Sequence, residues 1–412
     1  MAGFWLGIAW WRTSRPGCLG VVVHPLCHLR SVSPSTSPSN PTRLPLPETL
    51  LPGRLANHRP HRYRGEGFEW DARELGTAGR EVLIRLYRGL EDVYQQWRGQ
   101  RSNPEWEALE ARISALTGEG FVAQVEGLAH GLPTAPTEGG NASEGARLQR
   151  DGDEARLLRA GKALHDIRGG AFTSLVVQSR TVREGLPPGL SLEDLRLSNV
   201  FLARDHAKMM RNALPWIDPE GRRRDLEERP HRVESVFGKW DSVDRLPSQG
   251  GGSVAVDVVR RYEGLLASCC LEVSALERVL SNLLANAVRF ATASPVRVEV
   301  DPVEPEAVRC LVANRIAPDD AAWLHHRCRG KPGHLFRSRV AGGRAGGQGL
   351  GLATCADFVC AAFGLRGVNQ ALRAGYLGAW WGEGWFIAWV HWPALSPPGE
   401  AAPAPADVTS DA

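Results

Sequence analysis

Two asparagines lie four residues apart in a segment with the pattern of an amphipathic helix. The segment covers residues 276–291, LERVLSNLLANAVRFA, and places Asn282 and Asn286 on one helical face. Asparagine is a mediocre helix former, so this pair, with Arg289 one turn further on, indicates a surface that does chemistry. The alternative is a buried helix whose amides are satisfied by the backbone. The apolar stripe that would pack on a sheet consists of Leu276, Val279, Leu280, Leu283, Leu284 and Ala287.

A glycine-rich stretch directly precedes an apolar helical segment further along the chain. Residues 346–352 read GGQGLGL, and glycines let backbone N–H groups approach an anion at a helix N-terminus. The stretch predicts phosphate binding if it shares a pocket with the asparagine helix; otherwise it is a flexible connection. A dinucleotide site needs a strand immediately before the loop, and LFRSRVAGGRA precedes it, which argues against that site.

A histidine and an aspartate are adjacent at His165 and Asp166, within a long helical pattern. A neutral imidazole nitrogen is nucleophilic near neutral pH, and a neighbouring carboxylate can orient the ring or take its proton. The alternative is an exposed helix histidine beside an acidic residue. His206 is the other nearby candidate, and it lacks the HD-x-R context.

Two long helical patterns carry this histidine, over residues 153–184 and 192–214, and a Pro-Gly turn joins them. A hairpin of two helices buries its faces poorly, so pairing with a second copy into a four-helix bundle is expected, and with it a homodimer. Gly169 and Gly170 lie inside the first pattern, and they predict a bend beside the histidine.

The remaining segments are read from composition and periodicity. We expect disorder over 1–65 and 396–412, a linker over 130–150, and helices near 70–97 and 104–116 within a small helical region, 66–129, of unknown role. Alternating apolar residues predict strands over 295–302 and 308–314, and the aromatic runs around Gly382-Glu383-Gly384 predict a hairpin whose tryptophans cover a core. A helical layer over such strands is an α/β sandwich.

Composition narrows the classes of function. Of the 412 residues, 43% are apolar and 23% charged, and the net charge of +3 gives no reason to expect a nucleic-acid partner. No pair among the eight cysteines has CxxC spacing, so a zinc or redox site is not expected. The N-terminal apolar runs are too short or interrupted for a stable membrane span, and they lack a signal-peptide pattern. A cytoplasmic protein of two or three domains is therefore expected.

The order of these motifs resembles the bacterial sensor histidine kinases, within the wider ATPase superfamily that includes Hsp90 and the gyrases. The resemblance rests on HDIRGG at 165–170, NLLANAVRF at 282–290, LF at 335–336 and GGQGLGL. It implies an α+β multidomain protein, with a dimerisation and phosphoacceptor hairpin over 151–245 followed by an α/β sandwich ATP-binding domain over 250–395.

The resemblance also implies a role for each motif residue. Asn286 matches the asparagine that offers an amide oxygen to Mg²⁺, which prefers oxygen ligands. Asn282 and Arg289 would line the phosphate side of an ATP pocket, His165 would accept the phosphoryl group, and Asp166 would orient its ring or take its proton. The backbone donors of a lid over the phosphates would be Gly347, Gly349 and Gly351.

Two motifs depart from the family pattern. The family has Asp-x-Gly-x-Gly at the adenine site, and this chain has a degenerate motif there, in which Asn314 replaces the aspartate and both glycines are missing. An asparagine accepts a hydrogen bond from adenine through its amide oxygen without adding charge. After the histidine, Gly169 and Gly170 stand where the family has a polar residue and proline, so phosphatase activity towards a partner is not expected.

The function implied is that of an ATP-dependent protein histidine kinase, which autophosphorylates His165 and passes the phosphoryl group to an aspartate of a response-regulator receiver domain. The competing interpretation is a catalytically inactive nucleotide-binding scaffold or sensor module of the same fold, which Asn314 favours and the His165-Asp166 pair opposes. A serine kinase acting on an anti-sigma antagonist would keep the ATP domain and leave the helical hairpin unexplained.

Overall fold

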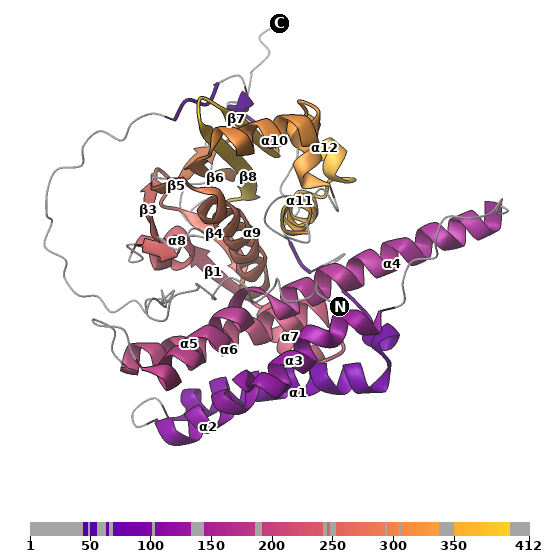
Figure 1. Ribbon diagram of the computed structural model, residues 1–412, viewed down its shortest axis with the longest axis vertical. Coiled ribbons are helices and arrows are strands. Elements are labelled where there is room, and N and C mark those ends of the chain that lie inside the picture. Colours follow the sequence, from indigo (N-terminus) through magenta and orange to yellow (C-terminus); the bar gives the residue numbers. More distant parts are fainter. Residues whose placement is uncertain are drawn as a thin grey trace, which may run out of the picture.

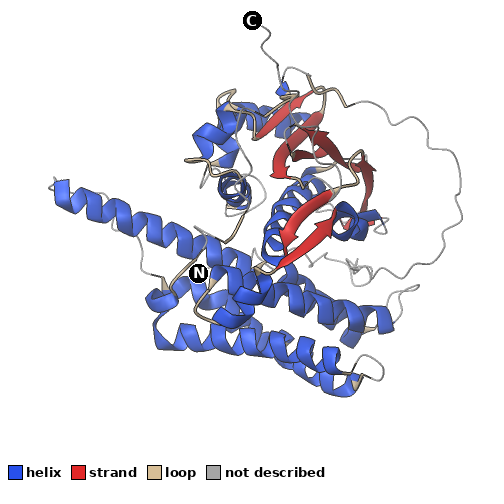
Figure 2. Ribbon diagram, turned by 180° about the vertical axis from the view of Figure 1, so that it is seen from behind, coloured by secondary structure: helices blue, strands red, loops and turns tan. Residues whose placement is uncertain are grey.

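The chain folds into a helical bundle and a mixed α/β domain (Figures 1 and 2). This arrangement, shown here in a computed structural model, confirms the α+β multidomain class expected from the sequence. The structure describes residues 44–47, 50–55, 63–65, 69–100, 104–132, 144–185, 192–241, 245–247, 253–292, 295–304, 306–337 and 350–395.

The bundle is built from amphipathic helices that share one apolar interior. Helices α1 and α5 both pack along α6, and α2 packs on α5. Leu86, Leu164 and Phe172 are among the buried side chains that these helices contribute. The bundle contains η2 (Ala72–Leu75), α1 (Gly76–Gly99), α2 (Trp106–Thr117), α3 (Glu119–Gly127), η3 (Leu128–Gly131), α4 (Glu144–Arg168), α5 (Gly170–Glu184) and α6 (Leu192–Ala213).

The bend predicted beside His165 is present. Helix α4 ends at Arg168, α5 begins at Gly170, and Gly169 between them has an extended backbone, with φ −98° and ψ −164°. A Cβ on Gly169 would lie 2.9 Å from the carbonyl oxygen of His165, closer than real side chains approach a backbone oxygen. The single helix expected over 153–184 is therefore two helices, and they meet directly after the turn that carries the histidine.

The N-terminal helices cover the hairpin from within the same chain. The sequence predicted no role for residues 66–129. In the structure they form α1, which packs along α6, and α2, which packs along α5 (Figure 1). Leu90, Val93 and Leu109 of these helices are fully buried. Helices of the same chain thus cover the hairpin faces. The expectation that a second copy must cover them is not needed to explain their burial.

Some predictions of linkers and disorder need correction. The predicted linker over 130–150 is helical from Glu144, where α4 begins. Three short segments within the predicted disorder over 1–65 pack onto the α/β domain: the Leu55 N–H donates to the Glu304 carbonyl at 2.8 Å, and Leu55 and Tyr63 are buried. Isolated apolar residues in a Pro-rich stretch have no periodicity, so only the distant surface that covers them reveals their role. The rest of 1–65 and the tail 396–412 lie outside the described residues.

A six-stranded mixed sheet forms the frame of the α/β domain. Its strand order is β2-β3-β5-β6-β8-β7; β3 and β5 are parallel, and the other neighbours are antiparallel. The two predicted strands and the aromatic hairpin are confirmed, with Glu383 and Gly384 at positive φ in the tight turn. The strands are β2 (Arg245–Pro247), β3 (Ser253–Arg260), β5 (Val296–Val303), β6 (Ala307–Arg315), β7 (Leu377–Gly382) and β8 (Trp385–Pro393).

Helices cover one face of this sheet, which makes the expected α/β sandwich. Along β6, Val308, Cys310 and Val312 enter the core shared with the helices, while Leu311 and Ala313 point to the opposite face. On that opposite face Leu44, Leu46 and Leu51 pack beside the buried Trp389. The helical layer comprises α8 (Val233–Asp241), α9 (Cys270–Phe290), α10 (Pro318–Cys328), η4 (Pro332–Phe336), α11 (Gly351–Ala362) and α12 (Val368–Arg373).

Short elements connect the bundle to the sandwich. Asp218 caps α7 (Pro219–Asp225) by accepting from the Gly221 N–H at 2.8 Å. A two-stranded sheet follows, in which β1 (Glu228–Arg232) pairs with β4 (Leu265–Cys269), and β4 leads directly into α9. In the part of the chain that the structure describes, every helix is too short or too polar to cross a membrane.

Candidate active site

Helix α9 presents a polar stripe of three residues spaced four apart. Arg278, Asn282 and Asn286 follow one another along one face, and the predicted apolar stripe on the other side is buried. At the N-terminus of α9 the Glu272 carboxylate accepts from the Ser268 N–H at 2.9 Å, which fixes the first turn. No role was predicted for Arg278 from the sequence. Its position four residues before Asn282, on the same helical face, is the signal that could have identified it.

Asn282 lies against the helix that follows the glycine loop. A Cβ on Gly351, the first residue of α11, would be 3.4 Å from the Asn282 Oδ1. The Asn282 side chain also hydrogen-bonds the Cys355 thiol, whose pKa is nevertheless raised to about 12 by burial. Asn282 therefore joins α9 to α11 at the end of the loop. Gly347 and Gly349 lie outside the described residues.

Asn286 and Arg289 occupy the last turns of α9, where both side chains are half-buried. Partial burial lowers the pKa of Arg289, which stays a cation because an arginine pKa lies far above neutral pH. Among the described residues, no three or more His, Cys, Asp or Glu side chains gather into a metal site. The Asn286 amide oxygen is the kind of ligand that Mg²⁺ prefers.

Asn314 supplies a buried acceptor near the end of β6. It is fully buried on the same face of the sheet as Cys310 and Val312, the face that α9 covers. Its Nδ2 donates to the Arg315 carbonyl at 3.1 Å, whereas its Oδ1 is buried with no hydrogen-bond partner among the described residues. An orphaned buried acceptor costs free energy unless a ligand completes it. The chemistry of this oxygen fits the exocyclic amino group of adenine.

His165 lies in the last turn of α4, immediately before the break at Gly169. Its side chain is 31% exposed. Its Nδ1 is 3.4 Å from the Asp166 Oδ1, which leaves Nε2 as the nitrogen available for attack. Burial, and then the positive charges of Arg168 and Arg278, lower the pKa of His165 to about 4. The imidazole is therefore neutral, the form that is nucleophilic, at physiological pH.

Two ion pairs hold α4 against the α/β domain. The Asp166 carboxylate pairs with the Arg278 guanidinium of α9, and both side chains are largely buried. One turn earlier on α4, the Lys162 ammonium pairs with Asp357 of α11. The helix with the histidine is thereby fixed beside the two helices that flank the predicted nucleotide site.

His206 is unsuitable as a phosphoacceptor. Its imidazole on α6 is fully buried and packs on Phe172, with ring centroids 5.5 Å apart. Burial lowers its pKa to about 3, against a backbone hydrogen bond involving Ile167 that raises it. A side chain without solvent access cannot meet a phosphoryl donor. Of the two histidines, His165 is the one whose side chain is partly exposed.

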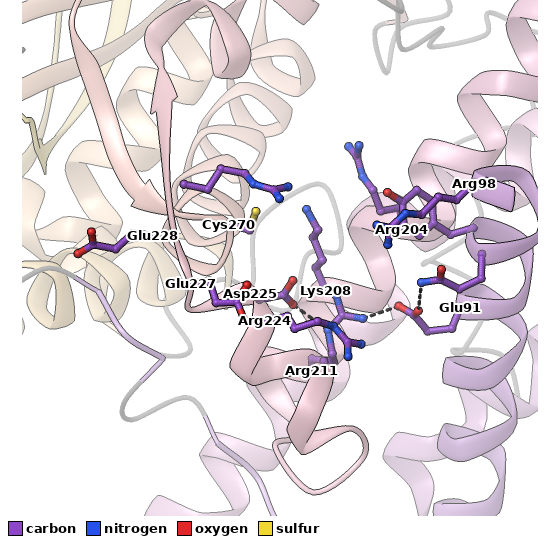
Figure 3. A pocket seen from close by; sticks show the side chains of 14 residues that line it. Glu91, Arg98, Arg204, Lys208, Arg211, Arg224, Asp225, Glu227, Glu228 and Cys270 are labelled. Atoms are coloured by element: carbon purple, nitrogen blue, oxygen red, sulfur yellow. Dashed lines mark hydrogen bonds and ion pairs between the residues drawn. The ribbon is translucent and has the colours of Figure 1, made fainter. Parts of the chain in front are cut away.

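A polar cleft of about 440 Å³ lies elsewhere, between α1, α6, α7 and the start of α9 (Figure 3). Arg211 crosses it and pairs with Glu91 and with Asp225, the latter at 2.7 Å. None of the predicted site residues lines this cleft. For that reason we do not assign the nucleotide to this cleft, although six cationic and four anionic side chains line it.

One family model matches part of the chain. Residues 272–374 match the family model of the "Histidine kinase-, DNA gyrase B-, and HSP90-like ATPase". This range covers α9 from Glu272 onwards, all of β6, and the glycine-rich residues 346–352. No curated protein matches the sequence at a significant level.

Several solved structures are similar at low sequence identity. The mycobacterial sensor histidine kinase MprB is 15% identical, with 40% of this chain and 97% of that chain covered and a TM-score of 0.26. The Acinetobacter baumannii histidine kinase AdeS is 15% identical, with 56% and 98% covered and a TM-score of 0.23. Full-length ShkA in complex with AMPPNP is 14% identical, with 70% and 47% covered and a TM-score of 0.29.

Proposed function

We propose that the protein is an ATP-dependent protein histidine kinase that autophosphorylates His165, because residues 272–374 match the histidine kinase-, DNA gyrase B- and HSP90-like ATPases. The observation that carries the proposal is the position of His165. It is partly exposed, it contacts Asp166, and Asp166 is paired with the helix of the ATPase domain that bears Asn282 and Asn286.

The residues of the nucleotide site fall into two groups, one that contacts the adenine and one that contacts the phosphates. Asn314 accepts from the adenine amino group through its orphaned Oδ1. Asn286 holds Mg²⁺, Arg289 counters the phosphate charge, and Asn282 with Gly351 positions the end of the loop that carries Gly347 and Gly349. ATP supplies the γ-phosphoryl group, and the transfer needs mainly positioning and charge stabilisation.

The acceptor side is prepared by the chain itself. His165 is neutral, so the Nε2 lone pair is available, and Asp166 takes the Nδ1 proton when the ring becomes a cation. From phosphorylated His165 the phosphoryl group passes to an aspartate of a response-regulator receiver domain. The cytoplasmic location inferred from the sequence belongs to the same proposal.

The second candidate is a nucleotide-binding scaffold that transfers no phosphate. The degenerate adenine motif at Asn314 favours it, since a family aspartate is missing there. Both candidate functions include ATP binding, so a binding measurement cannot distinguish them. A measurement of phosphoryl transfer can.

Incubation with γ-labelled ATP and Mg²⁺ separates them. A kinase labels the wild-type protein and loses the label in His165→Gln, while His325→Gln, on the exposed face of α10, keeps it. The label is expected to be acid-labile and alkali-stable, as a phosphoramidate is and a phosphoserine is not. Wild-type protein that binds ATP but takes no label supports the scaffold instead.

Partners are tested with the labelled protein. Label that moves to a purified receiver domain, and not to the same domain with its acceptor aspartate changed to asparagine, supports phosphotransfer. The homodimer is part of the proposal through the family, although α1 and α2 already cover the hairpin. A homodimer must therefore use another surface, and light scattering at twice the chain mass is the expected result; the mass of one chain would contradict it.

A further inference from the structure

The Arg278 guanidinium is only partly used by the contacts around it. It pairs with Asp166 through Nη2, while its Nε and Nη1 are buried with no hydrogen-bond partner among the described residues. Its central carbon lies 4.5 Å from the ring centroid of Phe358 on α11, and this stacking fixes the plane of the group. Its side chain is 13% exposed. Buried donors that nothing satisfies are costly, so their retention calls for a ligand.

A second arginine shares this feature. Arg168 follows His165 by three residues on α4, so the two side chains lie on the same face of the helix. The Arg168 Nε is also buried without a hydrogen-bond partner among the described residues. Glu126 of α3 provides the opposing charge that acts on Arg168.

Both arginines act electrostatically on His165. After burial, the charges of Arg168 and Arg278 are the causes that lower the pKa of the imidazole. Burial also lowers the pKa of Arg278, to about 10, which leaves it a cation at neutral pH. Geometry places both cations near the ring: Arg278 pairs with the Asp166 carboxylate that contacts His165, and Arg168 lies one turn further along α4. Such a setting disfavours a proton on the ring and favours an anion on it.

We propose that Arg278, assisted by Arg168, forms a binding site for the phosphoryl group carried by His165. The inference rests on the proposed function in that it takes His165 as the phosphoacceptor. It adds a positioning role for two residues that the nucleotide site itself does not use. A guanidinium binds phosphate oxygens in a bidentate manner along an edge that includes Nη2, so Arg278 can do this through Nη2 with Nε or Nη1 once Asp166 releases Nη2.

The transfer step explains how Arg278 becomes available. The Nε2 lone pair of His165 forms the new bond to phosphorus, and the bond from phosphorus to the leaving group breaks with its electron pair. The ring proton on Nδ1 passes to the Asp166 Oδ1, 3.4 Å away. A protonated Asp166 is neutral and no longer holds the Arg278 charge. The guanidinium is then free to turn to the phosphoryl dianion on His165.

The test loads His165 without using the ATP site. Phosphoramidate transfers its phosphoryl group to histidine and releases ammonia. The ³¹P resonance of phosphorylated His165 is assigned by its absence in His165→Gln. Its pH titration gives the pKa of the bound phosphoryl group, which adjacent cations lower. We expect the midpoint in Arg278→Gln to be higher than in wild type by about one pH unit, and higher by less in Arg168→Gln.

Two further variants separate ligand binding from a structural role. Arg278→Lys keeps the charge and is expected to restore most of the lowered midpoint. Asp166→Asn breaks the same ion pair from the other side but keeps Arg278, so its midpoint is expected to stay at the wild-type value. Equal midpoints in wild type and Arg278→Gln, or an Asp166→Asn midpoint raised as far as that of Arg278→Gln, would overturn the inference.

The outcomes are distinct from those for the kinase proposal. Wild-type protein that takes no label from ATP, but shows an Arg278-dependent midpoint after phosphoramidate, rejects the kinase and keeps the phosphoryl site. Label from ATP together with equal midpoints in wild type and Arg278→Gln supports the kinase and rejects the phosphoryl site.

Discussion

The Asp166 carboxylate, next to His165 on α4, pairs with the Arg278 guanidinium, one turn before Asn282 on α9. This pair links α4 to α9 through one buried contact. In the proposed kinase, a shift of α9 would therefore reach the carboxylate proposed to take the His165 proton. The Lys162–Asp357 pair fixes the same helix to α11.

The break at Gly169 is expected to set the position of His165. In Gly169→Ala the new Cβ would lie 2.9 Å from the His165 carbonyl oxygen, so the last turn of α4 must move. We expect a labelling rate lower by about 10-fold or more with the Kd for ATP unchanged, since misplaced reacting groups lose rate steeply.

The matched control is Gly161→Ala on the same helix, where a Cβ meets nothing within 4 Å. Alanine is the better helix former, so this variant is expected to gain up to about 1 kcal/mol and keep the wild-type rate. Equal losses in the two variants would show that helix rigidity, not the local clash, controls the reaction.

Asn286 is expected to matter only when the metal is present. Asn286→Ala removes the amide oxygen, and we expect ATP binding in Mg²⁺ to weaken by roughly 10- to 100-fold, the effect of losing one contact to a charged group. Titration calorimetry in excess chelator is expected to show no difference from wild type. Asn369→Ala, on the exposed side of α12, serves as the control and is expected to bind ATP normally. A loss of equal size in chelator would remove Asn286 from the metal site.

Asn314 is expected to select adenine. Asn314→Ala removes the buried acceptor, so ATP should bind about 10-fold more weakly, whereas GTP, which presents an acceptor at that position, should change little. Asn314→Asp keeps an acceptor oxygen and is expected to preserve the preference for ATP. Competition binding with both nucleotides measures this, and parallel losses for ATP and GTP in Asn314→Ala would place adenine elsewhere.

Stability is expected to fall as the solution is acidified below about pH 6.5. Burial lowers the pKa of His206 to about 3 and that of His391 to about 4, below the value of 6.5 for an unfolded chain. Between those values the unfolded state binds more protons than the folded state, so acid favours unfolding. For His206 alone the loss at pH 5 is about 2 kcal/mol.

Urea unfolding at pH 7 and pH 5 measures this loss. In His206→Leu the difference between the two pH values is expected to shrink by about 2 kcal/mol, whatever the variant costs in packing. His325→Leu, at an exposed position, is expected to leave the difference unchanged. A pH dependence that persists in full in His206→Leu would contradict the assignment.

Local patterns were sufficient for the elements that carry most of the site. The 3.6-residue period of α9 and the two-residue period of β5 and β6 are properties of neighbouring residues, so they were readable without a structure. The glycines at 169 and 170 likewise announced a break where the helix ends. The predicted adenine site was harder to find, because Asn314 replaces the aspartate of the family motif and both glycines of that motif are missing.

Contacts between distant segments could not be read in this way. Tyr63 lies in a Pro-rich stretch, yet its hydroxyl hydrogen-bonds Asn212 on α6 at 3.0 Å and its ring packs on Phe358 of α11. In the sequence, Arg278 is one of several polar residues on α9. Only the structure shows that it pairs with Asp166. No periodicity encodes such pairs, because their spacing along the chain is arbitrary.

The sequence by itself was enough to predict which residues carry the proposed chemistry: His165, the asparagine pair, Arg289, Asn314 and the glycine-rich stretch, each marked by residue type and local spacing. Tertiary structure alone decided how the bundle is completed and what surrounds His165. Helices α1 and α2 of the same chain cover the hairpin, and Arg278 reaches the phosphoacceptor turn from another domain. The physical reason is that burial and charge pairing depend on which surfaces meet in space, and that is settled only when the whole chain folds.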